Sequence, residues 1–178
     1  IPKKNLAIIS GPSHAEEVAQ EKLTYLTVGT KNSKLGKYIS ELLKTKYIIS
    51  TVSNDMIGIE YSSSLKNIYS IMVGIAHGLG YGDNFLSVLI SHCSKEMSDF
   101  IKDVHKTNRK INQSAYLGDL LVTTYSSFSR NRTFGNMIGK GYSIKSAKAE
   151  MNMVVEGYYA TKNAFMLSKK LSTKFLII

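Results

Sequence analysis

Residues 118–135 read GDLLVTTYSSFSRNRTFG, and this stretch indicates more about the fold and its use than any other. Asp119 stands at the start of an apolar run, hydroxyl side chains crowd residues 123–129, and Arg130, Asn131 and Arg132 follow. Arginine offers a planar fork of donors that matches a phosphate edge, while Asn and hydroxyl groups fill the remaining lone pairs. Two arginines alone would indicate a solvated basic loop. With Asp119 and the hydroxyls beside them, the stretch predicts a small-anion site.

The composition is that of a globular protein. The 178 residues are 43% hydrophobic and 20% charged, which predicts one folded domain, or one domain plus a piece of another. The net charge of +10 would suit a nucleic-acid-binding protein. The lysines, however, are scattered along the chain and form no basic stripe, so we expect no nucleic-acid partner.

We expect a soluble, cytoplasmic protein without membrane insertion and without a metal. Cys93 is the single cysteine and falls within an apolar pattern, which indicates a packed thiol in a reducing compartment. No apolar run is long enough to cross a bilayer, and the four histidines lack metal-ligand spacing. The first residue is not Met, and apolar runs stand near both ends, so we expect a piece of a longer protein.

The first 53 residues alternate between strand and helix patterns. The run from Leu6 to Ser10 is typical of a buried strand in a parallel sheet. Gly11 and Pro12 then turn the chain, and residues 13–16 have the spacing of a capping box at the start of a short helix. Two further strands are predicted at residues 23–28 and 47–51, and a helix is predicted between them at residues 34–44. The order β-α-β-α-β predicts part of an α/β domain.

From Asp55, a predicted helix cap, the hydrophobic residues recur at helical spacing. Long helices are predicted at residues 56–78 and 86–104, and shorter ones at residues 144–151 and 158–171. We therefore predict an α/β portion at residues 1–53 followed by an all-helical domain at residues 54–178.

Lys66 lies within the first long helix, on a face that carries Ser62, Ser63 and Ser70. Small neighbours let a ligand come close, and a partly desolvated lysine transfers its proton more easily. The other reading is a lysine whose stem lies along apolar surface and whose ammonium group reaches water. The helix alone favours neither reading.

Asp119 favours the proton-transfer reading. If Asp119 folds back toward Lys66, its carboxylate would hold the ammonium group and set its proton affinity. Asn67 and Thr124 could then complete a hydrogen-bonded pocket beside Arg130. A proton-transferring lysine beside a phosphate site suits redox or aldol chemistry on a small phosphorylated hydroxy or keto compound.

Five short motifs also occur in order along the chain. They are Ser10-Gly11-Pro12-Ser13, Ser64-Leu65-Lys66-Asn67, Gly118-Asp119-Leu120, Ser129-Arg130-Asn131-Arg132 with Gly135, and Val154-Val155-Glu156-Gly157. In this order they resemble the motifs of the NAD(P)-dependent glycerol-3-phosphate dehydrogenases, over nearly the whole chain. The resemblance implies the end of a nucleotide-binding domain joined to a helical domain of the 6-phosphogluconate-dehydrogenase-like C-terminal type, in truncated form.

The resemblance implies reduction of dihydroxyacetone phosphate to sn-glycerol 3-phosphate with NADH or NADPH, for phospholipid synthesis, by a homodimer. Lys66 matches the general acid/base, and Asp119 matches the carboxylate that pairs with it. The other matching positions are Gly11 and Ser13 in a substrate-contacting turn, Ser129, Arg130 and Asn131 at the substrate phosphate, and Ala15, Arg130, Val154 and Glu156 at the cofactor. Asn67 and Thr124 complete the predicted substrate site.

Part of that family's plan is missing from the sequence. No G-x-G-x-x-G follows a strand, and the glycines at residues 78–82 follow a helix with the wrong spacing. We expect the missing units, with a second active-site lysine, before Ile1, so this chain by itself should be inactive. The choice between NADH and NADPH stays open. Two alternatives remain: another two-domain NAD(P)-dependent hydroxyacid-type dehydrogenase, and a non-catalytic basic binding module.

Overall fold

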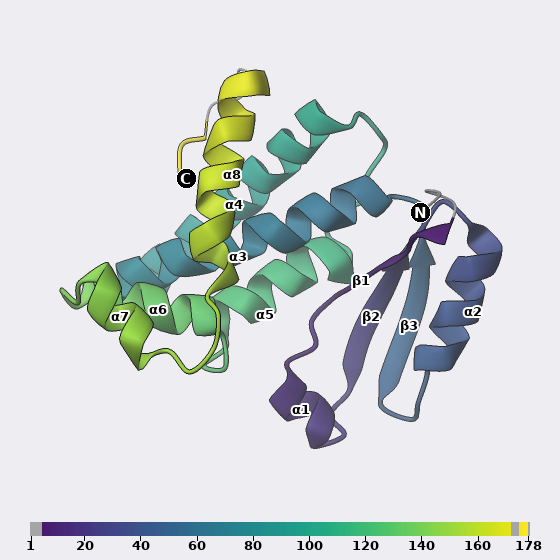
Figure 1. Ribbon diagram of the computed structural model, residues 1–178, viewed down its shortest axis with the longest axis horizontal. Coiled ribbons are helices and arrows are strands. Elements are labelled where there is room, and N and C mark those ends of the chain that lie inside the picture. Colours follow the sequence, from purple (N-terminus) through teal and green to yellow (C-terminus); the bar gives the residue numbers. More distant parts are fainter. Residues whose placement is uncertain (1–4, 172–174, 178) are drawn as a thin grey trace. The chain divides into compact units, whose positions relative to one another are not determined.

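The computed structural model describes residues 5–171 and 175–177 (Figure 1). The chain divides into two compact units: unit 1 comprises residues 1–63 and 109–119, and unit 2 comprises residues 64–108 and 120–178. Residues 1–4, 172–174 and 178 lie outside the described residues, so the last residue of the C-terminal apolar run is not described.

Unit 1 begins with the predicted β-α-β-α-β order, which is confirmed. Its elements are β1 (Ile8–Ser10), α1 (Ala15–Ala19), β2 (Thr24–Gly29), α2 (Ser33–Leu43) and β3 (Ile48–Ser53). The strands form one sheet in the order β1-β2-β3, and α2 packs against β2 and β3 (Figure 1). Asn32 caps α2, because its side-chain oxygen accepts from the backbone N–H groups of Lys34 and Leu35.

Strand β1 does not pair as the sequence predicts. It runs antiparallel to β2, with Ile8 opposite Gly29, whereas β2 and β3 are parallel, with Thr24 opposite Ile48. The prediction of a parallel strand at this position is therefore wrong. The connecting helix α1 has five residues and buries none of them, so it does not serve as the packed crossover helix that usually links parallel strands.

The capping box predicted at residues 13–16 is also wrong. His14 is the N-cap residue of α1 and makes no side-chain capping bond. The Ser13 hydroxyl instead donates to the Gly11 carbonyl at 2.9 Å, within the turn that follows β1. The cap predicted at Asp55 is confirmed, because its carboxylate accepts from the Gly58 N–H at 3.1 Å at the start of α3 (Met56–Gly78).

Unit 1 also contains the first turns of α3 and a π-helical turn at Ser114–Gly118. Unit 2 is helical, as predicted. It is built from the rest of α3, α4 (Asp83–Val104), α5 (Asp119–Tyr125) beyond its first residue, α6 (Arg130–Gly139), α7 (Ile144–Glu150) and α8 (Glu156–Leu171).

The core of unit 2 lies mainly between α3 and α4. Their buried apolar side chains recur at helical spacing, as the amphipathic pattern requires. They are Leu65, Ile68, Tyr69, Val73, Leu86, Ile90, Cys93, Met97, Phe100 and Ile101. Burial raises the pKa of the Cys93 thiol to about 12, so the sulfur stays protonated and packs as a small apolar group. None of the helices in the described part of the chain is both long enough and apolar enough to cross a membrane.

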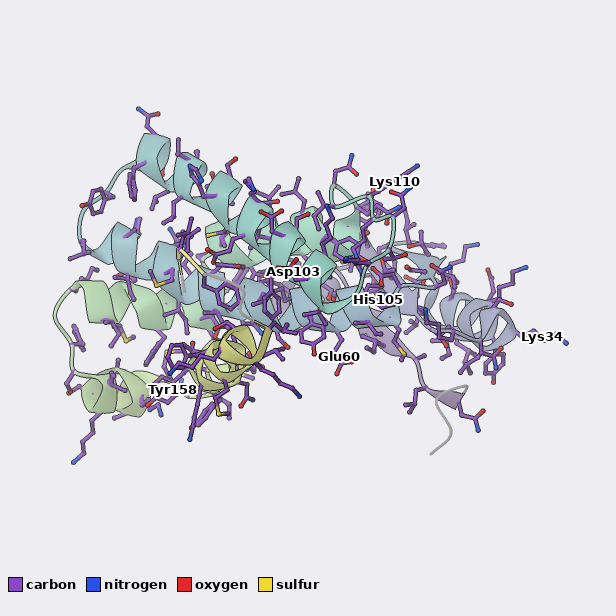
Figure 2. All side chains as sticks on the ribbon, turned by 90° about the horizontal axis from the view of Figure 1, so that it is seen from above. Lys34, Glu60, Asp103, His105, Lys110 and Tyr158 are labelled. Carbon is purple, nitrogen blue, oxygen red and sulfur yellow. The ribbon has the colours of Figure 1, made fainter. Side chains whose placement is uncertain are left out.

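A smaller cluster joins α6, α7 and α8. It contains the buried residues Phe134, Ala147 and Val155, with Tyr158 packed against them. Tyr158 lies near the start of α8 (Figure 2), and the Lys148 ammonium nitrogen lies 3.5 Å from the centroid of its ring. This cluster fixes the start of α8 against α6 and α7.

Candidate functional site

Lys66, Asn67 and Ser70 lie on the part of α3 that belongs to unit 2, the unit that also holds the predicted anion site. Lys66 and Asn67 are half-buried, and Ser70 is fully buried. The Ser70 hydroxyl donates to the Thr123 carbonyl at 2.7 Å and lies 3.0 Å from the Ser129 hydroxyl. Because Ser70 is one turn beyond Lys66 on the same face, the two residues are separated by roughly 6 Å along the helix axis.

The start of α6 carries the three residues predicted to hold a phosphate. Ser129 is the N-cap residue, and its hydroxyl accepts from the Arg132 N–H at 3.3 Å. Arg130 and Asn131 are the first two residues of the helix. An anion at this position would face backbone N–H groups at the positive end of the helix dipole, in addition to the side chains.

The start of α8 lies against both of these segments. The Gly157 N–H donates to the Asn131 side-chain oxygen at 3.0 Å. Gly157 also lies so close to α3 that an added Cβ would stand 2.5 Å from the Asn67 carbonyl oxygen. Gly157 therefore lies between Asn67 and Asn131, and only a residue without a side chain fits there.

Arg130 is paired with Glu156, the first residue of α8. The Arg130 Nη2 atom lies 3.0 Å from Glu156 Oε1, and the two side chains are 36% and 49% exposed. At that exposure the ion pair is weak, so an incoming anion can compete for the guanidinium group.

Close packing of α3 on α6 sets the spacing of these residues. A Cβ at Gly135 would overlap the Ile71 carbonyl oxygen, and a Cβ at Gly139 would overlap the Ile75 carbonyl oxygen. The two helices therefore touch backbone to backbone and run in the same direction. This packing holds Ser129, at the start of α6, beside Ser70 of α3.

Six predicted residues thus belong to unit 2, and we call them the α3–α6–α8 site: Lys66, Asn67, Ser129, Arg130, Asn131 and Glu156. Two more predicted residues lie in the same unit. Thr124 is fully buried, and its hydroxyl donates to the Leu120 carbonyl at 2.8 Å within α5. Val154 precedes α8 and is 62% exposed.

The other predicted residues belong to unit 1. Gly11 has a φ of +139°, which favours glycine, and Ser13 and Ala15 follow it. Asp119 is 2% exposed, and its carboxylate accepts from the Ser10 hydroxyl at 3.0 Å. The pairing of Asp119 with Lys66 stays a prediction.

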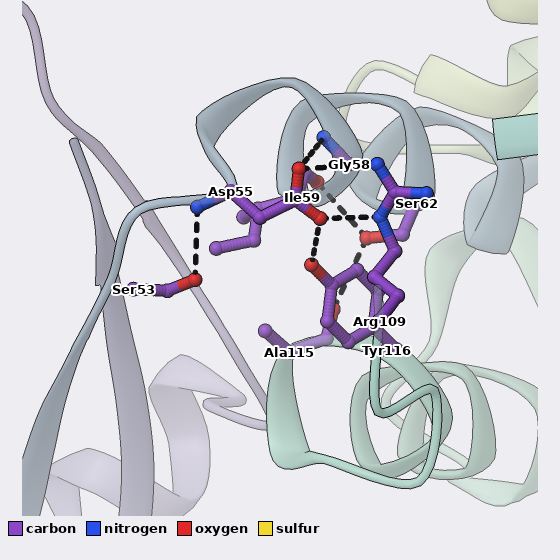
Figure 3. A network of polar contacts seen from close by, with 8 residues as sticks. All are labelled: Ser53, Asp55, Gly58, Ile59, Ser62, Arg109, Ala115 and Tyr116. Carbon is purple, nitrogen blue, oxygen red and sulfur yellow. Dashed lines mark hydrogen bonds and ion pairs between the residues drawn. The ribbon is translucent and has the colours of Figure 1, made fainter. Parts of the chain in front are cut away.

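Sequence reasoning missed two groups of residues around these positions. Ser10 stands in a quoted motif, and Ser70 on the predicted polar face of α3, but neither was assigned a partner. The second group is a buried network of Asp55, Arg109 and Tyr116 in unit 1 (Figure 3). Nothing in the local pattern around Arg109 could have paired it with Asp55, which is 54 residues away.

The described residues contain no group of three His, Cys, Asp or Glu side chains that could hold a metal ion. Three of the residues predicted to contact the cofactor have side chains that suit a dinucleotide. The exposed Val154 offers an apolar surface, Glu156 offers a carboxylate acceptor, and Arg130 offers a guanidinium group for a phosphate.

Two family models match the chain. Residues 55–178 match the model described as NAD-dependent glycerol-3-phosphate dehydrogenase C-terminus, and residues 1–36 match the corresponding N-terminus model.

Curated relatives agree with these matches. The chain is 38% identical over 175 residues to the glycerol-3-phosphate dehydrogenase [NAD(P)+] of Bacillus velezensis, covering 98% of the chain and 51% of the relative. It is 39% identical over 173 residues to that of Fusobacterium nucleatum, covering 97% and 52%. The chain thus spans about half the length of the curated relatives it matches.

Solved structures share the fold. The crystal structure of glycerol-3-phosphate dehydrogenase from Coxiella burnetii matches with a TM-score of 0.92 and 34% identity, over 95% of this chain and 52% of that one. The Plasmodium falciparum glycerol-3-phosphate dehydrogenase, at 20% identity, matches with a TM-score of 0.84 over 94% of this chain and 48% of that one, which is a likeness of fold.

Proposed function

Because the chain belongs to the NAD-dependent glycerol-3-phosphate dehydrogenase family, we propose that it supplies the substrate-binding and catalytic half of such an enzyme. The reaction is the reversible reduction of dihydroxyacetone phosphate to sn-glycerol 3-phosphate with NADH or NADPH, which provides the backbone of glycerophospholipids. The observation that carries the proposal is the α3–α6–α8 site, where a lysine-bearing helix face and a capped helix start with an arginine occur in one compact unit.

In this proposal the substrate phosphate binds at the start of α6. Arg130 supplies a planar fork of charged donors, and the Ser129 hydroxyl would turn from Ser70 toward the phosphate. Asn131 adds its amide NH2 group, since its side-chain oxygen already accepts from Gly157. The phosphate would replace the Glu156 carboxylate as partner of the Arg130 guanidinium group, which leaves Glu156 for the cofactor.

Lys66 acts as the general acid in the proposed reaction. NADH or NADPH supplies the hydride that forms the new C–H bond at C2 of the substrate. The Lys66 ammonium group donates a proton to the C2 oxygen, so the carbonyl becomes a hydroxyl, and in the reverse direction Lys66 accepts that proton. Asp119 is proposed to hold the lysine, and Asn67, Gly11 and Ser13 to line the substrate. Thr124 is proposed to complete the substrate site, which requires its buried hydroxyl to turn from the Leu120 carbonyl. Ala15 and Val154 are proposed to contact the cofactor.

Substrate assays separate this proposal from a related dehydrogenase. The complete enzyme, meaning a full-length protein that carries this chain, should oxidise NADH or NADPH with dihydroxyacetone phosphate and not with a non-phosphorylated keto acid. Turnover with the keto acid alone would favour another two-domain hydroxyacid-type dehydrogenase. The preference for the phosphorylated substrate should depend most on Arg130, the charged group at the start of α6.

The alternative of a non-catalytic basic module is supported only by the net charge of +10. An oligonucleotide titration at several salt concentrations tests it. Tight binding that weakens steeply as salt rises would favour the basic module, because released counterions drive such binding. We expect no such binding.

We also propose that the complete enzyme is a cytoplasmic homodimer. The family resemblance supports the dimer, and the single, buried Cys93 suits a reducing compartment. Light scattering of the purified complete enzyme should give twice the monomer mass, and a monomer mass would remove the dimer from the proposal.

A further inference from the structure

Asp55 stands at the centre of a buried network in unit 1 (Figure 3). Its Oδ1 atom accepts from Arg109 Nη2 at 3.1 Å and from the Gly58 N–H at 3.1 Å. Its Oδ2 atom accepts from Arg109 Nε and, at 2.6 Å, from the Tyr116 hydroxyl. The Arg109 and Asp55 side chains are only 8% and 10% exposed. One carboxylate therefore caps α3, receives a two-point arginine contact and accepts from a phenol.

The hydrogen bonds within this network determine which of its groups are charged. Burial by itself would raise the pKa of Asp55, but the hydrogen bonds from Arg109, Tyr116 and Gly58, with the arginine charge, hold that pKa below its usual range. Burial and the neighbouring Asp55 raise the pKa of Tyr116. Asp55 is therefore a carboxylate at neutral pH, and Tyr116 keeps the proton that it donates.

The packing admits no larger residue at the contact with α3. A Cβ at Gly58 would overlap the Asp55 carboxylate and stand 2.5 Å from Arg109 Nε. The guanidinium group thus lies directly on the backbone of the first turn of α3.

Both Arg109 and Tyr116 belong to the segment that leads to Asp119. The segment ends in the π-helical turn Ser114–Gly118, and Asp119 is the next residue. Within it, the Leu117 N–H donates to the Ile111 carbonyl at 3.0 Å. The Ser62 hydroxyl of α3 donates to the Ala115 carbonyl at 3.1 Å. Arg109, Ala115 and Tyr116 therefore fasten the segment to Asp55 and to the first turns of α3. π-Helical turns are frequent at functional sites.

Asp119 has a further anchor within unit 1. Its carboxylate accepts from Ser10 at 3.0 Å, and Ser10 ends strand β1. The hydroxyl of Ser114, at the start of the π-helical turn, lies 3.4 Å from that of Thr27 in β2. The sheet and the Asp55 network thus hold the same short segment from two sides.

Stability alone is a poor explanation of this network. A buried ion pair recovers little more than the cost of removing two charges from water, and well-packed apolar residues of similar volume often serve as well. The bonds of such a network do, however, specify geometry, because each has a fixed direction and length.

We propose that Asp55, Arg109 and Tyr116 are positioning residues, which hold the Ser114–Gly118 turn so that the Asp119 carboxylate keeps the orientation needed for the reaction. This inference rests on the proposed function, in which Asp119 holds the proton-transferring Lys66. Loosening the turn lowers the fraction of molecules with a correctly placed carboxylate, and a misplacement of about 1 Å is enough to slow a reaction strongly.

Tyr116→Phe tests the proposal with the loss of a single hydroxyl. Tyr69→Phe is the matched control, because Tyr69 is also buried and its hydroxyl also donates to a carboxylate, that of Glu96 at 3.2 Å in unit 2. In the complete enzyme, Tyr116→Phe should lower kcat about 10-fold while the KM values for dihydroxyacetone phosphate and NADH stay within about 2-fold. Tyr69→Phe should leave kcat within about 2-fold. Equal kcat values for the two variants would overturn the proposal.

Hydrogen exchange provides a second readout that needs no activity. Amide exchange within residues 111–119 should be faster in Tyr116→Phe than in the unsubstituted protein and unchanged in Tyr69→Phe. Unchanged exchange in Tyr116→Phe would overturn the positioning of the turn. If the unsubstituted enzyme reduces no dihydroxyacetone phosphate, the proposed function fails, and the exchange result still decides whether the network holds the turn.

Arg109→Lys covers the case in which Tyr116→Phe does not fold. Lysine keeps the charge but loses the two-point contact with Asp55. It should lower kcat and speed the same amide exchange, again with little change in KM. An enzyme with normal kcat and normal exchange would overturn the proposal.

Discussion

The hydroxyl groups of Ser70 and Ser129 lie 3.0 Å apart, and this contact joins two segments that are 59 residues apart in the sequence. Ser70 is one helical turn beyond Lys66, and Ser129 caps the helix that begins with Arg130. The contact therefore holds the start of α6, which carries the proposed phosphate-binding Arg130, beside the helix α3 that carries the proposed acid/base Lys66. The two serines are both buried, so the distance between these helix segments does not depend on exposed side chains.

Arg130→Ala should weaken substrate binding. Each charge-assisted hydrogen bond that the guanidinium group makes is worth about 1.5–3 kcal/mol, so the KM for dihydroxyacetone phosphate should rise by about 10- to 100-fold. Steady-state kinetics of the complete enzyme measures this. Arg130→Lys keeps the charge without the planar fork, so its KM should lie between those of the unsubstituted enzyme and Arg130→Ala. A KM that stays the same in Arg130→Ala would remove the phosphate contact from the account.

Gly135→Ala should destabilise unit 2. The added methyl group would overlap the Ile71 carbonyl oxygen, and a backbone atom within a helix cannot move away cheaply. We expect the free energy of unfolding, measured in urea, to fall by about 1–3 kcal/mol, in the range of other overpacked sites. Gly82→Ala is the control, because a Cβ at Gly82 meets nothing within 4 Å. Its cost should stay below about 1 kcal/mol, and an equal cost at both positions would contradict the close contact of α3 with α6.

Asp55→Asn should change how stability depends on pH. The folded protein holds the pKa of Asp55 below its unfolded value of about 3.9, so this contribution is present above that pH and is lost as pH falls through the folded value. At neutral pH the substitution leaves the buried Arg109 without its charged partner, at a cost of about 3–5 kcal/mol.

Urea unfolding from pH 7 down to about pH 3 measures this dependence. The free-energy difference between the unsubstituted protein and Asp55→Asn should shrink as the pH falls below about 4. A difference that stays constant over that interval would mean that Asp55 is not held as a carboxylate by Arg109 and Tyr116.

Local patterns predicted most of the helices and strands, because their causes are local. The spacing of apolar residues in α3 and α4 and the carboxylate of Asp55 at a helix start are visible within a few residues of sequence. The direction of β1 was not visible in this way. An antiparallel partner needs no packed crossover helix, and no local pattern showed that α1 would bury no residue.

The sequence was enough to name the residues of the α3–α6–α8 site, but it did not predict most of the contacts between them. Arginine, asparagine and serine at residues 129–131 indicate an anion site by their chemistry alone. Gly157 lies between Asn67 and Asn131 because α3, α6 and α8 pack together, and no local pattern specifies that packing. The network around Asp55 was missed for the same reason, since its members are 54 and 61 residues apart.

In the proposed function, Lys66 transfers the proton in the reduction of dihydroxyacetone phosphate. The most direct measurement is the rate of NADH oxidation by the complete enzyme at saturating dihydroxyacetone phosphate, compared between the unsubstituted protein and Lys66→Ala. Lys95→Ala is the control, because Lys95 is 73% exposed on α4 and pairs only with Asp99 among the ion pairs of the described residues.

We expect Lys66→Ala to lower kcat by about 10²- to 10⁴-fold, the usual contribution of a general acid, while NADH still binds with unchanged affinity in a fluorescence titration. Lys95→Ala should turn over normally. If Lys66→Ala kept the turnover of the unsubstituted enzyme, Lys66 would not be the proton donor, and the proposed role of the α3–α6–α8 site would be wrong.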